Sequence, residues 1–413
     1  MNDYIFLLGC ILLLIMSFQV TKDIISPEVL FPIPWIIATI ILITGDFSYN
    51  PQSMAFFYLL IGAVIFEIGC FIGHNKINSK ERIITKKQNK AFRPTVLFIL
   101  MMLEIIFICF VLYTYILYTR NNFNVNIFTT LYSNKENMFG SGVIGYGRNL
   151  ISAFSIAIIV GYGIIEEDKK NQYKKILMVQ IAIALINGIL GVTRNGILSA
   201  LLPLAFACIV VFNINSKKAF KTLFVSFLFF LSIFLIVSMQ KYWYTINDES
   251  VISIQLSKQI QLYASGSLAA FQKIFDTKIY TLLYGENTFR FFIAIFDVIF
   301  GVNKSSSLVQ DFINIGNTSI NVYTFYQYYL YDFGPIYALI VQFIIGILHG
   351  VSFKNMSMKK PFWIFLYSIL IYPLLMQFFQ DQYFSIFSTW MQLIIVGFLT
   401  LKTDLLFYVK IKK

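Results

Sequence analysis

The sequence predicts an all-α polytopic membrane protein with about eleven transmembrane helices, in a range of about 10–13. Of its 413 residues, 58% are hydrophobic and only 13% are charged, whereas about 25% of the residues in an average soluble domain are charged. The apolar residues also gather in long runs. About 20 such residues are what an α-helix needs to cross a hydrocarbon core of about 30 Å.

The predicted spans follow one another with short polar connections between them. They cover residues 4–20, 29–45, 54–73, 95–118, 149–165, 176–193, 195–213, 220–239, 334–353, 361–380 and 382–401. No tandem repeat or low-complexity linker divides the chain. A single integral membrane domain is therefore predicted over residues 1–413.

The longest connection, residues 240–333, is predicted to be a large extracytoplasmic loop that contains short helices. Its first part is polar and its last part is aromatic. The apolar stretch 291–302 is too short to cross the bilayer. Three placements are open for it: in the membrane interface, dipping in and returning, or packed on the bundle.

Lysine and arginine residues predict the orientation. The loop 74–94 is rich in both and is expected on the cytoplasmic side, and alternation from it places the N-terminus outside and the C-terminus inside. Topology thereby explains the net charge of +12, and no nucleic-acid partner is expected. The four cysteines lie in apolar runs without nearby histidines, so neither a disulfide nor a metal site is predicted.

Three arginines are predicted at the outer membrane face, where an ordinary channel or receptor needs few charges. Arg148 opens the fifth predicted helix, Arg194 lies in the tight turn 191–196, and Arg290 ends the segment 285–290. A guanidinium stays charged, and its planar fork matches two phosphate oxygens at once. Three of them around one cavity would suit a pyrophosphate, whereas each one alone could be an interfacial anchor.

The turn around Arg194 is the most informative of the three segments. It joins two apolar runs with almost no loop, and an arginine so close to lipid is expected to face a cavity or a partner. The next helix is predicted to begin at about Asn195. The positive end of its dipole would then favour an anion at the same place, with Asn195 among the substrate-binding residues.

Residues 321–335 combine aromatic side chains with a turn. Six of the first eleven residues are aromatic, and we expect Asn321, Tyr323 and Tyr326 to bind sugar by stacking and hydrogen bonding. Asp332 precedes Phe-Gly-Pro and is predicted to be the N-cap of the following helix. It is also a candidate general base toward an acceptor hydroxyl. The alternative is an aromatic interface belt with a capping aspartate.

Other carboxylates compete for the role of base. Glu286 lies in the large loop and is the second candidate. Asp311 in the same loop and Asp46 at an outer helix end are further candidates, whereas Glu67 and Glu104 lie within helices, nearer the cytoplasm.

These segments resemble the O-antigen or oligosaccharide repeat-unit polymerases, the Wzy-type family. The resemblance is carried by residues 145–149, 191–196 and 321–334, and by the plan of many helices with one large outer loop in the second half. Family members also carry Arg-x10-Gly motifs in outer loops, and Arg290 and Gly301 have that spacing. Arg148 and Arg194 do not.

The resemblance implies a metal-independent glycosyltransferase without a cofactor. Its substrate would be an undecaprenyl-pyrophosphate-linked oligosaccharide, whose growing glycan passes to the non-reducing end of a new lipid-linked repeat unit. It further implies the bacterial cytoplasmic (inner) membrane, an active site facing the periplasm or cell exterior, contact with membrane lipid, and a chain-length regulator as a partner protein. Arg194 and Arg290, with Arg148, would hold the pyrophosphate.

Three other functions stay open at this point. An O-antigen ligase-like transferase uses the same donor in a similar bundle. A flippase or transporter of lipid-linked sugar would be expected to carry charges deep in several helices and repeat symmetry, which this sequence does not show. The third is a structural membrane protein with no chemistry.

Overall fold

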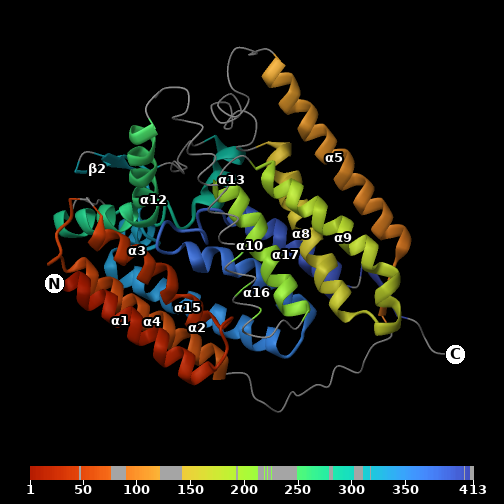
Figure 1. The fold of residues 1–413 in the computed structure, drawn as a ribbon, viewed down its shortest axis with the longest axis horizontal. Coiled ribbons are helices and arrows are strands. Elements are labelled where there is room, and N and C mark those ends of the chain that lie inside the picture. Colours follow the sequence, from red (N-terminus) through yellow and green to blue (C-terminus); the bar gives the residue numbers. More distant parts are fainter. Residues whose placement is uncertain are drawn as a thin grey trace. The chain divides into compact units, whose positions relative to one another are not determined.

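The structure is a computed structural model (Figure 1). It describes residues 1–45, 48–75, 90–120, 142–191, 194–212, 218, 221, 225, 249–278, 282–301, 310–316, 318–403 and 405–409. The chain forms two compact units. Unit 1 comprises Met1–Asn78, Ser253–Lys354 and Pro373–Ser388, and unit 2 comprises the segments Ser79–Ile252, Asn355–Tyr372 and Thr389–Lys413. The expected single membrane domain stays a prediction.

Unit 1 is built from helices and one short hairpin. Its elements are α1 (Asn2–Thr21), α2 (Pro27–Leu30), α3 (Pro32–Thr44), α4 (Ala55–Asn75), most of α12 (Glu249–Thr277), α13 (Arg290–Phe300), the strands β2 (Ile313–Ile315) and β3 (Thr318–Ile320), α14 (Tyr326–Phe333) and most of α15 (Pro335–Ser357). The two strands pair antiparallel, with Ile313 opposite Ile320. Helix α1 packs on both α3 and α4.

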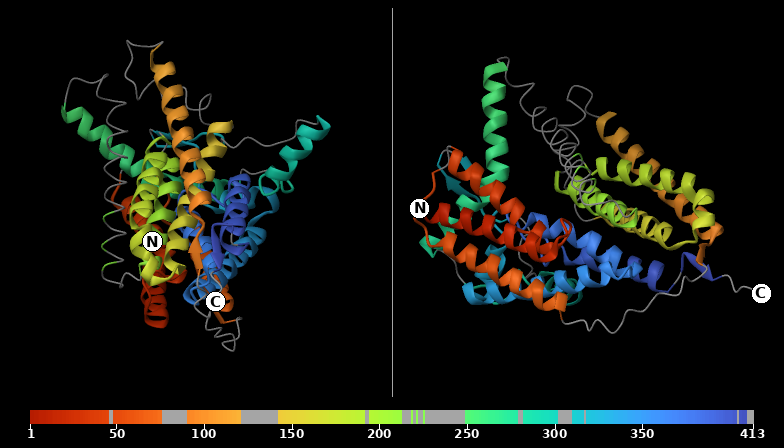
Figure 2. Two further views of the ribbon diagram at one scale, coloured as in Figure 1. Left: turned by 90° about the vertical axis from the view of Figure 1, so that its right-hand side faces the viewer. Right: turned by 60° about the horizontal axis from the view of Figure 1, so that its bottom comes forward.

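Unit 2 contains a second group of packed helices. Its elements are β1 (Lys90–Phe92), α5 (Pro94–Arg120), α8 (Val143–Ile164), α9 (Glu167–Ile189), α10 (Arg194–Val211), most of α16 (Pro361–Met376) and of α17 (Phe387–Gly397), a π-helical turn (Phe398–Lys402) and β4 (Phe407–Val409). Helices α8, α9 and α10 contact one another and run side by side (Figure 2, right).

Six helical segments among the described residues are long and apolar enough to cross a membrane. They are Asn2–Thr21, Pro27–Thr44, Ala55–Asn75, Pro94–Leu117, Val143–Ile164 and Pro335–Ser357. Each coincides with a predicted run, which confirms a polytopic, predominantly α-helical membrane protein. The runs at 195–213, 361–380 and 382–401 are apolar helices shorter than the six.

Two predicted spans are not among these helices. The run 176–193 is the second half of α9, whose first half is polar and carries Lys169, Lys170, Lys174 and Lys175. The uncharged part of that helix is therefore too short to cross by itself. The run 220–239 falls almost wholly outside the described residues. The number eleven accordingly stays a prediction.

Glycines bring α4 and α15 into backbone contact. Gly69 and Gly73 of α4 face Gly346 and Gly350 of α15, and a Cβ atom added to Gly69 would lie 2.5 Å from the carbonyl oxygen of Phe343. Small residues four apart on both helices allow this approach, which in lipid is a main source of helix association. Gly346 and Gly350 thus form a small-residue packing motif of the kind that membrane helices use.

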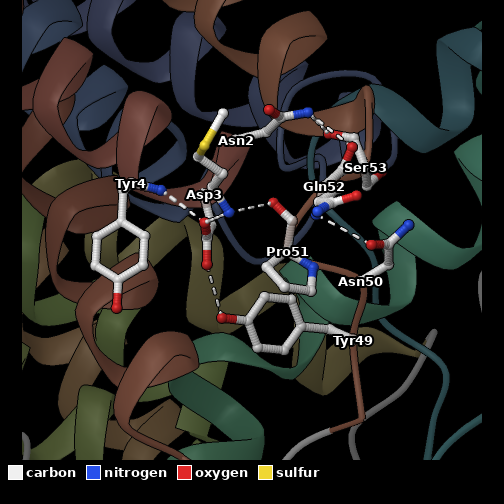
Figure 3. Close-up of polar contacts among 9 residues, drawn as sticks. Asn2, Asp3, Tyr4, Tyr49, Asn50, Pro51, Gln52 and Ser53 are labelled. Atoms are coloured by element: carbon white, nitrogen blue, oxygen red, sulfur yellow. Dashed lines mark hydrogen bonds and ion pairs between the residues drawn. The ribbon is translucent and has the colours of Figure 1, made fainter.

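The start of α1 is bound to the connection before α4 (Figure 3). The Asn2 side chain donates to the Gln52 carbonyl at 2.7 Å, and the Tyr49 hydroxyl donates to Asp3 at 2.9 Å. The same connection bonds to α12, because the Ser53 hydroxyl donates to Asp276 at 2.6 Å. Three segments that the sequence predicts outside thus lie at one end of unit 1.

Unit 2 shows the same agreement for segments predicted inside. The strand β1, from the end of the basic loop, pairs antiparallel with β4 near the C-terminus, and Arg93 Nε donates to the Phe407 carbonyl at 2.7 Å. Tyr173, near the polar start of α9, packs edge-on against Phe92. These three segments gather at one end of the unit, as alternation across a membrane requires.

Candidate functional site

Arg148 is held by α9 in unit 2. It lies in the second turn of α8, which begins at Val143, so the prediction that Arg148 opens this helix is wrong. The helix runs through Gly147, where the lack of a side chain leaves room for the Phe107 ring to pack against α8. Arg148 Nη2 donates to the Asn187 carbonyl at 3.1 Å, and the Asn187 amide donates back to the Arg148 carbonyl at 3.0 Å.

The same contact brings two sequence motifs together. A Cβ atom at Gly191 would lie 2.5 Å from Arg148 Nη2, so the Arg148 guanidinium borders the turn that leads to α10. That helix begins at Arg194, which confirms the predicted start to within one residue, and Asn195 is half-buried in its first turn. The Arg194 side chain lies outside the described part of the chain. Arg148 Nε is buried, and no described residue forms a hydrogen bond with it.

In unit 1, Asp332 fastens the turn before α13 to α14. The carboxylate is fully buried, and each of its oxygens accepts two hydrogen bonds. Oδ1 accepts from the backbone and side-chain amides of Asn287, both at 3.1 Å. Oδ2 accepts from the backbone N–H and the hydroxyl of Thr288, both at 2.6 Å. These four donors fix the backbone that leads into α13.

The prediction that Asp332 caps the following helix is therefore wrong. Asp332 lies in the last turn of α14, and Gly334, with φ of 86°, ends that helix before α15 begins at Pro335. The Asp332 carboxylate reaches back 45 residues to Asn287, not forward to α15. Because both carboxylate oxygens of Asp332 are buried and each already accepts two hydrogen bonds, the geometry favours a positioning role over the role of a general base.

Glu286 and Arg290 lie on the turn that Asp332 fixes. Glu286 is exposed, and Arg290 is half-buried at the first position of α13. Burial lowers the pKa of the Arg290 guanidinium from its ordinary value, and the nearby Tyr328 opposes that shift. A cation at a helix N-terminus is disfavoured by the helix dipole. An anion bound beside Arg290 would relieve this.

Tyr328 is the neutral neighbour of Arg290. Its hydroxyl accepts a hydrogen bond from the Gln380 amide at 3.1 Å, and burial raises the pKa of Tyr328 to about 12. The Tyr328 hydroxyl therefore keeps its proton at neutral pH. This hydrogen-bond donor lies near the Arg290 guanidinium.

The spacing of Arg290 and Gly301 is the length of one helix. Arg290 is the first residue of α13, and Gly301 ends it in the left-handed conformation with φ of 68°. The glycine at this place is explained by the backbone conformation, because other residues adopt it at a cost.

The aromatic residues of 321–331 mostly form protein core. Tyr326 is fully buried and packs on Trp35, Tyr58, Phe271 and Phe325, and Tyr323 is 3% exposed with its hydroxyl donated to the Asp311 carbonyl. Their burial favours the packing interpretation over sugar stacking. Asn321, by contrast, is half-buried at the edge of the same segment.

The remaining carboxylates are in different surroundings. Asp311 is exposed, and Asp46 lies outside the described residues. Glu104 is buried in unit 2 and accepts from the Gln180 amide at 2.7 Å, and Glu67 accepts from the Ser17 hydroxyl at 3.1 Å in unit 1. Both therefore serve contacts between helices, as the sequence allowed.

Sequence reasoning missed the residues that hold the candidate side chains. Asn187, Asn287, Thr288 and Gln380 are all contributed from distant positions in the chain. Asn187 alone had a signal, because an asparagine in the last turn of an apolar helix needs a polar partner. Arg148 and Arg194 belong to unit 2 and Arg290 to unit 1, so their gathering around one cavity stays a prediction.

Comparison with known proteins gives one informative relative. No family model matches the chain, and no solved structure matches it significantly. Over 287 residues it is 25% identical to an O-antigen polymerase of Shigella dysenteriae, and the match covers 68% of this chain and 67% of that protein. The chain is thus a distant homologue of an O-antigen polymerase.

Proposed function

We propose that this protein polymerises lipid-linked oligosaccharide repeat units in the bacterial cytoplasmic membrane. The observation that carries the proposal is the similarity over 287 residues to an O-antigen polymerase. Six long apolar spans support it, because a substrate with a polyprenyl tail reaches its enzyme within the bilayer. The proposed product is an O-antigen, capsule or exopolysaccharide chain.

The proposed reaction is a glycosyl transfer from undecaprenyl pyrophosphate. A hydroxyl at the non-reducing end of a new repeat unit attacks the anomeric carbon of the growing glycan. The bond from that carbon to the pyrophosphate oxygen breaks, and the lipid pyrophosphate leaves with the bonding electrons. The hydroxyl proton passes to a base. The pyrophosphate is itself the activated leaving group, so the proposal needs no nucleotide sugar.

Arginine is proposed to stabilise the leaving group. Charge develops on the pyrophosphate as the bond breaks, and a fixed guanidinium lowers the energy of that state more than that of the substrate. In unit 1 this role falls to Arg290, which the Asp332 turn positions and Tyr328 adjoins. In unit 2 it falls to Arg194 and Arg148 at the junction of α8, α9 and α10.

Glu286 is proposed as the general base. It is exposed on the turn that also carries Arg290, whereas both oxygens of Asp332 are already bonded to that turn. A base must reach the proton it removes, and of the two carboxylates Glu286 and Asp332, Glu286 is the exposed one. Asp332 is accordingly proposed as a positioning residue.

Extension of a purified lipid-linked repeat unit tests the proposal. The full chain, reconstituted in proteoliposomes, is expected to convert single repeat units into a ladder of longer glycans, in the presence of EDTA as well. Arg290→Ala is expected to abolish the ladder while the protein stays folded in the membrane. Normal long products from that variant would refute the role of Arg290, and no ladder from the wild type would refute the function.

A deletion strain separates polymerase from ligase. Loss of a polymerase leaves lipid cores capped with one repeat unit, whereas loss of a ligase leaves bare cores. We expect lipid cores capped with a single repeat unit.

A chain-length regulator is proposed as a partner protein. Co-expression with such a regulator should narrow the distribution of glycan lengths without changing the glycosidic linkage.

A further inference from the structure

Helix α13 exposes apolar side chains along its whole length. None of its residues is buried. Its exposed residues are Phe292 at 47%, Ile295 at 43%, Phe296 at 59%, Val298 at 88%, Ile299 at 64% and Phe300 at 66%. A helix so apolar and so exposed needs a surface to cover it, because contiguous exposed apolar patches mark interaction sites.

The polar residues of α13 share one face. Arg290 and Asp297 are seven residues apart and so lie about two turns from each other on the same side. The exposed apolar residues occupy the opposite and flanking sides. Eleven residues rise only about 16 Å, roughly half of what a crossing needs. The helix is therefore amphipathic and too short to span.

The turn before α13 fixes where the helix starts. The backbone N–H groups of Leu283 and Tyr284 donate to the carbonyls of Tyr331 and Asp332, which immediately precede the span α15. Phe291 and Phe292 contact Phe387, the first residue of α17. The first turn of α13 is thus attached next to the residues that precede the candidate span α15 and to the first residue of α17.

Helix α15 also has an exposed apolar side. Ile336, Ile340 and Ile344 follow one another at four-residue intervals and are 75%, 50% and 57% exposed. Such a stripe on a span faces acyl chains. It starts directly beyond the residues that bind the α13 turn, so the exposed apolar side of a candidate span begins close in sequence to the place where α13 is attached.

We propose that α13 lies in the plane of the membrane interface, at the end of the bilayer where α15 begins, with its apolar side covered by lipid acyl chains. Short helices with an apolar side and a charged side lie in this zone, buried about 5–10 Å into the headgroup and acyl boundary. The placement selects one of the three that the sequence left open for this stretch. Arg290 then sits among the lipid headgroups.

One consequence rests on the proposed function. A polyprenyl pyrophosphate carries its phosphates at the headgroup level and its tail among the acyl chains. A helix held in that plane keeps Arg290 at the depth of the pyrophosphate. The position of α13 itself does not depend on any enzymatic activity.

Spin labels on the full chain in nanodiscs of bacterial lipid test the position. Cys109→Ser and Cys208→Ala remove the two native thiols that are not buried, and the buried Cys10 and Cys70 stay. Single cysteines then replace Ile295, Ile299, Ala294 or Asp297. Ile336→Cys on the exposed side of α15 is the lipid control, and Lys278→Cys at the exposed end of α12 is the water control.

Spin labels at positions 295 and 299 are expected to be accessible to oxygen and not to a water-soluble nickel chelate. Both labels should lie at the same depth in the membrane. Labels at 294 and 297 should show the reverse preference. Nickel access at all four sites would overturn the proposal in favour of a solvated helix. Low access of both reagents would overturn it in favour of a protein partner or second copy, and a steady increase in depth would indicate a dipping helix. Loss of glycan extension with an unchanged access pattern would instead refute only the enzyme.

Discussion

Arg148 and Asn187 hold each other through two hydrogen bonds that run in opposite directions between α8 and α9. The guanidinium donates to the Asn187 carbonyl at 3.1 Å, and the Asn187 amide donates to the Arg148 carbonyl at 3.0 Å. The amide also donates to the Ser152 hydroxyl at 3.0 Å. One asparagine thereby sets the position of an arginine beside the start of α10.

Asn187→Ala is expected to destabilise unit 2 by about 1–3 kcal/mol, because it leaves buried polar groups on α8 without partners. The melting temperature in detergent measures this change. Asn171→Ala is the matched control, since Asn171 is exposed on the same helix. Equal melting temperatures for the two variants would contradict the interpretation of the contact.

Asp332→Asn is expected to abolish glycan extension, because an amide presents hydrogen atoms to donors on Asn287 and Thr288. A base and a positioning residue would both give that result. Thr288→Val separates these two roles of Asp332. The Thr288 hydroxyl is not a candidate base, but it donates a hydrogen bond to Asp332 at 2.6 Å. If Asp332 positions the turn, Thr288→Val should lower activity at least about tenfold, the effect of about 1.4 kcal/mol.

The control for Thr288→Val is Thr277→Val, at an exposed position whose hydroxyl bonds only within its own helix turn. It should leave extension unchanged. Full activity of Thr288→Val together with inactive Asp332→Asn would return the role of base to Asp332.

Glu286→Gln is expected to lower the turnover number of extension by about 10²–10⁴-fold with little change in KM, because a general base acts in the transition state. An unchanged turnover number would show that another group takes the proton. Glu286→Asp, which keeps the carboxylate but shortens the reach, should retain part of the activity.

Arg194→Ala is expected to abolish chain extension while the protein remains in the membrane. Arg194→Lys should recover only part of it, because an ammonium lacks the fork that matches two phosphate oxygens. Immunoblots of membranes and glycan ladders from the same cells measure both quantities. Arg82→Ala, in the basic loop predicted to be cytoplasmic, serves as the control.

Gly350→Ala is expected to separate α4 from α15, because the added methyl group would meet the Cys70 carbonyl. Overpacking of this kind costs about 1–3 kcal/mol. Gly142→Ala is the control, since nothing lies within 4 Å of a Cβ atom at Gly142. Thermal unfolding of the two variants should therefore differ, and an equally stable Gly350→Ala would mean that the helices pack less closely.

Features set by neighbouring residues could be predicted from the sequence. The six long spans, the start of α10 at Arg194 and the separate helix from Arg290 to Phe300 follow from local runs of side chains. The bonds of Asp332 could not be predicted, because its donors lie 45 residues away. The burial of Tyr326 could not be predicted either, because a tyrosine that packs in the core and a tyrosine that stacks on a sugar can have the same neighbours in sequence.

Gly145 and Gly147 lie where the predicted and the observed start of α8 differ. The predicted apolar run begins at residue 149, after both glycines. In the structure the helix begins at Val143 and runs through both, and Gly147 packs against Phe107 in spite of the low helix propensity of glycine.

Both compact units are discontinuous in the chain, and each includes residues from beyond position 372. A ribosome delivers the helices in order, so early spans must wait in the bilayer for partners that are synthesised last. The strand β1 meets β4 only when residue 409 has emerged. A nascent chain halted near residue 360 should therefore leave both units unfinished and open to membrane proteases, even if all its earlier helices have inserted correctly.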